Sequence, residues 1–216
     1  MDAQKKTRRT PRPRNAVASR QDILDGAMKE FCAKGFDGAR TEDIARRAQI
    51  NIRMLYHYFG NKERLYQACL EKVYEDLRAK EAEIDLLHLS PEEAIVALVD
   101  FTFEHMLAHP EFIRMVEIEN IHRGKFLKTL QVVPERGAFL IDMIRDVLLN
   151  GEADGSFRTG IDPFQLYISI LSLCYVHLSN QYTLSITFNK DLGQPEWLAE
   201  RNQHVRELIL AYLNRR

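Results

Sequence analysis

The segment from Thr41 to Phe59 constrains the fold more than any other part of the chain. It predicts two helices of about two turns each, joined by a tight turn at Gln49-Ile50, with Thr41 and Asn51 as their N-terminal caps. Helices this short cannot bury enough apolar surface by themselves. A longer helix, which apolar spacing predicts from Ser19 to Lys34, supplies the surface beneath them. The three together predict a helix-turn-helix, whose second short helix lies in the major groove of DNA.

Charge is divided unevenly along the chain. The formal net charge of all 216 residues is only −1, yet basic side chains outnumber acidic ones in residues 1–66 and acidic ones predominate afterwards. A basic front is typical of a segment that meets a polyanion, although chance asymmetry would look the same. Residues 1–18 are rich in Lys, Arg and Pro, so we expect a flexible basic arm there. Its cations would either track DNA or only keep the chain soluble: Lys5, Lys6, Arg8, Arg9, Arg12 and Arg14.

The rest of the sequence predicts helices only. Helical periodicity, proline at first turns and glycine or proline breaks divide it into six further helices, and no run alternates as a strand would. The predicted fold class is therefore all-α, with a three-helix helix-turn-helix domain over residues 19–66 and a six-helix ligand-binding and dimerisation domain over residues 67–216. The predicted helices of the second domain are about Asn61–Leu87, Pro91–Ala108, Glu111–Lys128, Pro134–Gly151, a helix from Pro163, and Pro195–Leu213.

The short helix predicted from Ile52 to Phe59 carries the side chains best placed to contact DNA. Leu55 and Phe59 lie one turn apart and face the core, so base edges are reached from the N-terminal end of the helix. Hydrogen-bond donors on either side of the base-reading residues suit the phosphates of the DNA backbone. Lys62 begins a helix whose free backbone N–H groups also favour an anion. The predicted DNA-binding residues are Arg40, Thr41, Asn51, Ile52, Arg53, Met54, Tyr56, His57 and Lys62.

The same region resembles the DNA-binding domain of the TetR/AcrR family of regulators, over about residues 19–66. The shared features are the Gly-aromatic turn, the Thr before the second helix, Ile-Ala, the Leu-Tyr-x-Tyr-Phe run and Asn-Lys-Glu-x-Leu, all within FCAKGFDGARTEDIARRAQINIRMLYHYFGNKERLY. Two positions depart from the family: Gln49 replaces the usual Gly of the turn, and Asn51 replaces the usual Ser cap. A residue other than Gly costs about 1 kcal/mol at position 49 if its backbone is left-handed.

The resemblance also implies how the C-terminal domain, residues 67–216, functions. Family members are homodimers built mainly on the last two helices, which are the eighth and ninth predicted here, and a small ligand between the other helices changes the spacing of the two DNA-reading heads. The segments HPEFIRMVEIENIHRGKFL and LSNQYTLSITFNKDLGQPEWLAERNQHV resemble one TetR C-terminal subgroup. An eighth helix that is apolar all round also needs cover from a second copy. The seam candidates are Leu171, Tyr175, Leu178, Leu208, Ile209 and Tyr212.

Effector contacts are predicted from polar and aromatic side chains on otherwise apolar helices, because a pocket needs a few polar groups to orient its ligand. The alternative is that each of these groups is satisfied within the core or the dimer seam. The candidates are Phe101, His105, Arg114, Glu117, Asn120, Ser172 and Tyr175.

No catalytic, cofactor or metal site is predicted. The sequence has no G-x-S-x-G, no P-loop and no G-x-G-x-x-G, and the i,i+4 pair His105 and His109 has no evident third metal ligand. The uncharged stretch Pro163–Phe188 is long enough for a membrane span but too polar for hydrocarbon, so no membrane partner is predicted. Three cysteines without a C-x-x-C pattern indicate a reducing cytoplasm.

These features favour a ligand-responsive transcription regulator, most simply a repressor that a small molecule releases from a palindromic DNA operator. One alternative is an activator on the same scaffold, which only the position of the operator relative to the promoter would separate. The other is a helical enzyme or small-molecule carrier that kept the domain shape, for which Lys62 and Arg53 would be dispensable.

Overall fold

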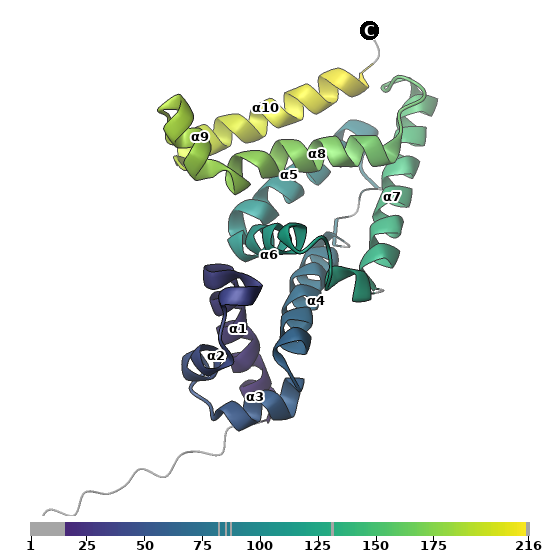
Figure 1. The fold of residues 1–216 in the computed structure, drawn as a ribbon. Coiled ribbons are helices and arrows are strands. Elements are labelled where there is room, and N and C mark those ends of the chain that lie inside the picture. The colour runs from purple at the N-terminus through teal and green to yellow at the C-terminus, as the bar shows by residue number, and fades with distance from the viewer. Residues whose placement is uncertain (1–15, 82, 85, 87, 131, 215–216) are drawn as a thin grey trace, which may run out of the picture. The chain divides into compact units, whose positions relative to one another are not determined.

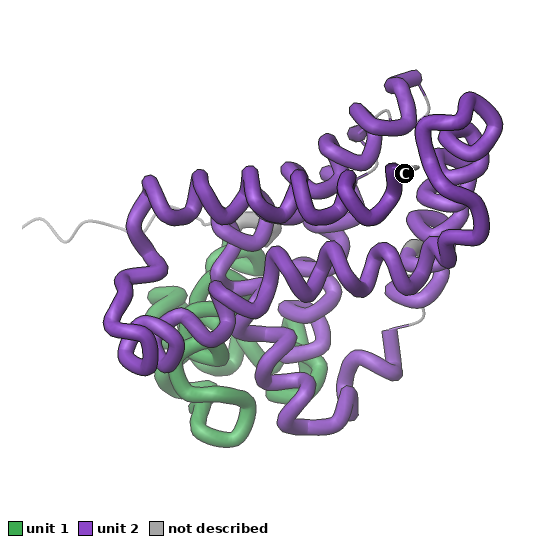
Figure 2. Tube along the Cα trace, turned by 90° about the horizontal axis from the view of Figure 1, so that it is seen from above, with its two compact units in different colours: residues 1–65 green, residues 66–216 purple. Residues whose placement is uncertain are grey.

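The computed structural model describes residues 16–81, 83–84, 86, 88–130 and 132–214, and these residues form ten α-helices and one 3-10 helix (Figure 1). The predicted all-α class is confirmed. Within the described residues the only β-type pairing is an isolated bridge between Phe157 and Asn214. Most of the predicted basic arm lies outside the described residues. The chain divides into two compact units, residues 1–65 and residues 66–216 (Figure 2).

The first unit is the helix-turn-helix. Helix α1 (Ala16–Gly38) packs against both α2 (Thr41–Arg47) and α3 (Ile52–Phe59), as the short helices require. Its core is apolar, and the largest side chains that are almost wholly buried there are Ile23, Phe31, Ile44, Leu55 and Leu65. The unit ends at Leu65, in the first turn of α4 (Lys62–Glu81).

Helix α1 begins earlier and ends later than predicted. It starts at Ala16, because Ala-Val-Ala before Ser19 contains no residue that stops a helix, and Ser19 lies buried inside the helix rather than at its cap. The backbone leaves helical geometry at Gly35, where φ is 71°, directly after the predicted end of the helix at Lys34. One more helical turn follows Gly35 and ends at Gly38, beyond the predicted end of the helix.

The second unit is organised around α5 (Pro91–Ala108). This helix contacts α6 (Pro110–Ile121), α7 (Val132–Asp154), α8 (Pro163–Ser179) and α10 (Pro195–Leu213), and Figure 1 shows α10 running beside α8. A salt bridge from Arg206 and a 3.2 Å hydrogen bond from Asn202 both reach the Asp100 carboxylate, which ties α10 to α5. Eight residues of α5 are buried: Ala94, Ile95, Leu98, Val99, Thr102, Phe103, His105 and Met106.

Helix ends in this unit differ from the predicted ones where the chain turns without proline. Helix α4 stops at Glu81 instead of Leu87, and Leu86 beyond it turns into the core. Helix α6 stops at Ile121, since Arg123 and Gly124 both have positive φ and the Gly124 N–H returns to the Glu119 carbonyl at 2.8 Å. A 3-10 turn, η1 (Leu127–Thr129), stands where the end of the sixth helix was predicted.

Two further differences come from the C-terminal half. Helix α7 runs past Gly151 to Asp154, and the ring of Phe157 lies so close to Gly151 that a Cβ there would be 2.2 Å from it. Helix α9 (Gln181–Phe188) was not predicted at all; it forms because the chain bends at Asn180, whose φ and ψ are −108° and 19°. Glycine therefore serves close packing inside α7 rather than ending that helix.

The turn of the helix-turn-helix carries the strain that its sequence predicts. Gln49 has φ of 54°, a left-handed conformation that disfavours side chains with a Cβ. We therefore expect Gln49→Gly to raise the free energy of unfolding by about 1 kcal/mol, measured by urea denaturation. Asn189→Gly, at another left-handed residue (φ 47°), should gain less because asparagine tolerates this region. A destabilised Gln49→Gly would contradict the strain.

Buried histidines predict how stability responds to acid. His177 is 3% exposed; its ring stacks on Phe103 with centroids 5.1 Å apart and meets Trp197 edge-to-face with centroids 5.5 Å apart. Burial, helped by the charge of Arg201, lowers the pKa of His177 from 6.5 to about 4. Between these values the unfolded chain binds a proton that the folded chain does not, so stability present above pH 6.5 is lost as the pH falls toward 4.

We expect His177→Leu to remove roughly 2–3 kcal/mol of the stability lost between pH 7 and pH 4, measured by urea unfolding across that range. The matched control is His204→Leu on the exposed side of α10, which should retain the wild-type pH dependence. Equal pH dependence in wild type and His177→Leu would show that His177 does not carry this effect.

Candidate DNA-binding site

Helix α3 presents its N-terminal end and buries its opposite side. Leu55 is fully buried and Phe59 is 6% exposed, and both hold the helix in the core of the unit. The Asn51 side chain accepts the Arg53 N–H at 2.9 Å, so Asn51 is the N-cap that the sequence predicts. Of the residues predicted to read bases, Ile52 is half-buried, whereas Arg53 and Met54 are exposed; His57, a predicted phosphate donor, is exposed as well. The exposed end of α3 thus carries apolar, cationic and hydrogen-bonding groups together.

Thr41 and Tyr56 join the two short helices. The predicted cap role of Thr41 is wrong: Arg40 occupies the N-cap position of α2 with extended backbone, and no side-chain cap bond is present. Thr41 is 8% exposed, and its hydroxyl lies 3.0 Å from the Tyr56 hydroxyl. Tyr56 itself is 43% exposed, so the bond holds its phenol at the surface; Arg40, which precedes Thr41 in the chain, is also exposed.

Lys62 is half-buried at the start of α4, where Asn61 caps the helix by accepting the Arg64 N–H at 2.8 Å. Its ammonium lies 4.7 Å above the ring of Phe36 and donates to the Asp37 carbonyl at 3.4 Å. Burial lowers the pKa of Lys62, and the Asp37 carboxylate only partly offsets this. The Lys62 side chain therefore has contacts within the unit that phosphate would have to replace.

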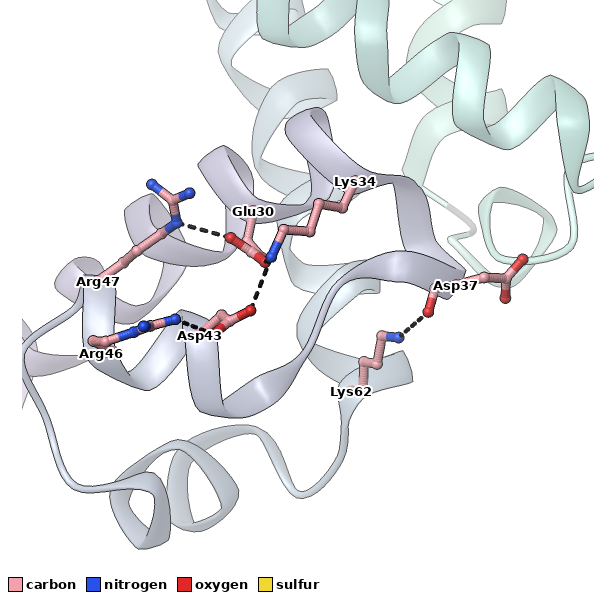
Figure 3. Close-up of polar contacts among 7 residues, drawn as sticks. All are labelled: Glu30, Lys34, Asp37, Asp43, Arg46, Arg47 and Lys62. Carbon is pink, nitrogen blue, oxygen red and sulfur yellow. Dashed lines mark hydrogen bonds and ion pairs between the residues drawn. The ribbon is translucent and has the colours of Figure 1, made fainter.

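A network of charged side chains braces α2 against α1 (Figure 3). The Glu30 carboxylate has no exposed surface, and it pairs with Lys34 at 2.6 Å and with Arg47 at 2.8 Å. Lys34 also bonds to Asp43 at 2.8 Å, and Asp43 in turn pairs with Arg46. Side chains of alternating charge thus join α1 to α2 around the buried Glu30 carboxylate.

In this network the ion pairs lower the pKa values of the carboxylates by more than burial raises them. Burial by itself would raise the pKa of Glu30, but the hydrogen bonds from Lys34 and Arg47 lower it overall. The hydrogen bond from Lys34 likewise lowers the pKa of Asp43. Glu30 was not among the residues predicted from the sequence. The i,i+4 spacing of Glu30 and Lys34 was the one available signal, because the contacts with Arg47 and Asp43 join separate helices.

The predicted effector residues fall into three groups. Phe101 and His105 lie together, with ring centroids 5.6 Å apart, and the Phe112 ring is 5.9 Å from His105. Arg114 and Glu117 form an ion pair at 2.8 Å on α6, and the Glu117 charge acts with burial to raise the pKa of Tyr175. The remaining two candidates are exposed and bond to carbonyls of their own helices: Asn120 to Val116 at 3.0 Å and Ser172 to Ile168 at 2.7 Å.

Buried polar groups that sequence reasoning missed lie near the end of α4. Glu81 is 4% exposed, pairs with Arg78 and accepts the Tyr167 hydroxyl at 3.4 Å. Burial raises the pKa of Tyr167, and the Glu81 charge adds to that effect. Among the described residues no cluster of three or more His, Cys, Asp or Glu side chains is arranged to hold a metal, and no helix is long and apolar enough to cross a membrane.

The fold and the exposed α3 define a DNA-binding regulator of the helix-turn-helix class. Residues 23–69 match the model of the bacterial regulatory proteins of the tetR family, and residues 91–209 match the tetracyclin repressor-like C-terminal domain. The chain belongs to the TetR family of transcription regulators. Members of this family bind operator DNA and small-molecule effectors as dimers, and they are regulators rather than enzymes.

Individual relatives agree with this assignment. The chain is 35% identical over 210 residues to the HTH-type transcriptional repressor NicS of Pseudomonas putida, which covers 97% of this chain and 99% of that protein. It is 27% identical over 164 residues to the repressor KstR2 of Mycolicibacterium smegmatis, covering 76% and 80%. The solved structure of the regulator SCO4942 from Streptomyces coelicolor has the same fold, with a TM-score of 0.68 and 22% identity over 92% of this chain and 99% of that one.

The network around Glu30 generates a stability prediction. We expect Glu30→Gln to lower the free energy of unfolding by about 1–3 kcal/mol, because the substitution removes a buried carboxylate that accepts from two cations. Asp76→Asn is the matched control, since its pair with Lys72 is exposed and should change stability by less than about 0.5 kcal/mol. Urea unfolding measures both variants, and equal effects would contradict the bracing role of Glu30.

Proposed function

We propose that this chain is a homodimeric repressor that reads a palindromic operator with α3 and is released by a small molecule bound in residues 66–216. The observation that carries the proposal is the exposed N-terminal end of α3, held outward by buried Leu55 and Phe59. That geometry suits insertion into a major groove. Repression rather than activation is favoured because NicS and KstR2 are both named repressors.

Within the DNA-binding unit the residues take different roles. Arg53, Met54 and Ile52 are proposed to read base edges, with Asn51 fixing the start of the helix. Arg40, Tyr56, His57 and Lys62 are proposed to bind phosphates, and Thr41 holds the Tyr56 hydroxyl in place. Cations of the Glu30 network already have acidic partners, so they contribute less to phosphate binding than exposed Arg40 and Arg53.

The dimer seam is proposed on α8 and α10, the helices that correspond to the eighth and ninth predicted ones. Both keep large apolar side chains at the surface of the single chain, which are Phe164, Ile168, Val176, Leu208 and Tyr212 at 41–54% exposure. Leu171, Tyr175 and Leu178 are half-buried beside them. Ile209, a predicted seam residue, is 2% exposed and belongs instead to the core of its own chain.

Effector binding is proposed around Phe101, His105 and Tyr175. His105 is 5% exposed, its Nδ1 has no hydrogen-bond partner among the described residues, and burial lowers its pKa to about 4. A neutral, unpaired ring nitrogen beside aromatic rings suits a small aromatic or amphipathic compound. Arg114 and Glu117 are proposed at the polar edge of the effector site, while Asn120 and Ser172 bond to their own helices and are weaker candidates.

The proposed place of action is the cytoplasm, consistent with three unbridged cysteines.

Binding to the DNA upstream of the chain's own gene tests the proposal. Footprinting should reveal a palindrome with half-sites about 34 Å apart or at a related spacing, and affinity should fall steeply as salt rises. Metabolites can then be screened for release of that complex. A purified chain without salt-sensitive preference for any duplex would refute the proposal.

Two substitutions separate base reading from phosphate binding. We expect Arg53→Ala to cost about 1–3 kcal/mol on the operator while leaving binding to random DNA nearly unchanged. Lys62→Ala should weaken both kinds of binding alike and reduce the salt slope by about 1. Fluorescence anisotropy at several salt concentrations measures both, with exposed Arg145→Ala on α7 as the matched control. Equal losses on operator and random DNA would remove Arg53 from base reading.

A further inference from the structure

Helix α9 is an apolar helix that its own chain leaves uncovered. None of its eight residues, all of which the structure describes, is buried. Tyr182 and Ile186 are each 82% exposed and lie one turn apart on the same side, and Phe188 at the last position is 69% exposed. These are higher exposures than those of the apolar side chains on α8 and α10. The sequence of α9, QYTLSITF, contains no charged residue.

An uncovered helix of this length is not stable by itself. Helices shorter than about 12–15 residues are marginal in water, and most helical stability in proteins comes from packing an apolar face. The N-cap residue Asn180 makes no side-chain cap bond, so capping does not compensate. The helix follows directly on α8, and Val176, one turn before the end of α8, is 47% exposed. The apolar surface therefore continues from α8 into α9.

We infer that α9 packs against a second copy of this chain and forms part of the dimer interface, beyond the seam on α8 and α10. The area favours this occupant. At their observed exposures, the five apolar side chains of the α8–α10 seam offer roughly 400 Å² per protomer. A standard interface takes about 800 Å² from each partner. About 60% of that area is apolar, which is roughly 500 Å² per partner, so the seam alone falls somewhat short. Tyr182, Ile186 and Phe188 add roughly another 400 Å², which takes the apolar area above that requirement.

The chemistry of the patch also fits a second copy. A surface without charge is suited to an apolar partner surface and offers nothing to anionic DNA or to a charged lipid headgroup. The same chain supplies a matching apolar face, in the exposed side chains of α8 and α10. This inference rests on the proposed dimer and adds to it the helix that the seam alone omits.

The test compares two double variants of the full chain by analytical ultracentrifugation. Tyr182→Gln with Ile186→Gln should raise the dimer dissociation constant at least 30-fold. The matched control is Ile121→Gln with Phe139→Gln, which replaces side chains of 77% and 61% exposure on α6 and α7 and should leave the constant within threefold of wild type. Circular dichroism checks that all variants keep their helix content.

Hydrogen exchange of the wild-type chain gives a second measurement that needs no variant. Amides of α9 should exchange more slowly at concentrations where the dimer forms than in the dilute monomer. An unchanged dimer constant in the Tyr182→Gln/Ile186→Gln variant, or concentration-independent exchange in α9, overturns the inference. A third outcome also overturns it: the double variant keeps the wild-type dimer dissociation constant but no longer binds neutral lipid vesicles that the wild-type chain binds. That outcome would assign α9 to a membrane surface.

The outcomes keep the two proposals apart. A wild-type dimer that binds its operator, with an α9 variant that dimerises equally well, removes α9 from the interface and leaves the proposed function intact. A wild-type chain that binds no duplex refutes the proposed function, whereas the dimer measurement on α9 can still be read without DNA.

Discussion

The burial of Leu55 and Phe59 is the interaction on which the DNA-binding unit depends. Helix α3 has only eight residues, so its position is set by these two side chains and by its contact with α1 rather than by its own helical stability. Once they are buried, helical geometry directs Arg53 and Met54 outward. The same two contacts therefore decide both whether α3 exists and which groups it presents to a groove.

Electrostatics imposes a second constraint, because α2 must be held against α1 without consuming the positive charge that DNA requires. Glu30 satisfies this constraint because its one buried carboxylate pairs with both Lys34 of α1 and Arg47 of α2. Those two cations are committed to the fold, along with Arg46 through Asp43. Arg40 and Arg53 stand outside these pairs, which is why the proposed phosphate and base contacts are assigned to the start of α2 and to the exposed end of α3.

Local signals in the sequence were sufficient for the fold class and for the caps and the turn that shape the candidate site. Asn51 and Asn61 cap the helices that they precede, and Gln49 adopts the left-handed turn that its position requires, because these features depend only on neighbours in the chain. Contacts between helices could not be predicted in this way. Glu30 with Arg47, Thr41 with Tyr56 and Lys62 with Phe36 each join residues that no periodicity links.

The same distinction explains the errors in the second unit. Gly151 looks like a helix end, yet the ring of Phe157 needs the space that a side chain would occupy, so the helix continues through it. The bend at Asn180 contains neither proline nor glycine, and the uncharged sequence on both sides reads as a single helix. The short helices α3 and α9 thus have the same physical requirement, which is an apolar surface to pack against. Helix α3 finds it on α1 of its own chain. Helix α9 has none of its residues buried, so we infer that it finds that surface on a second copy.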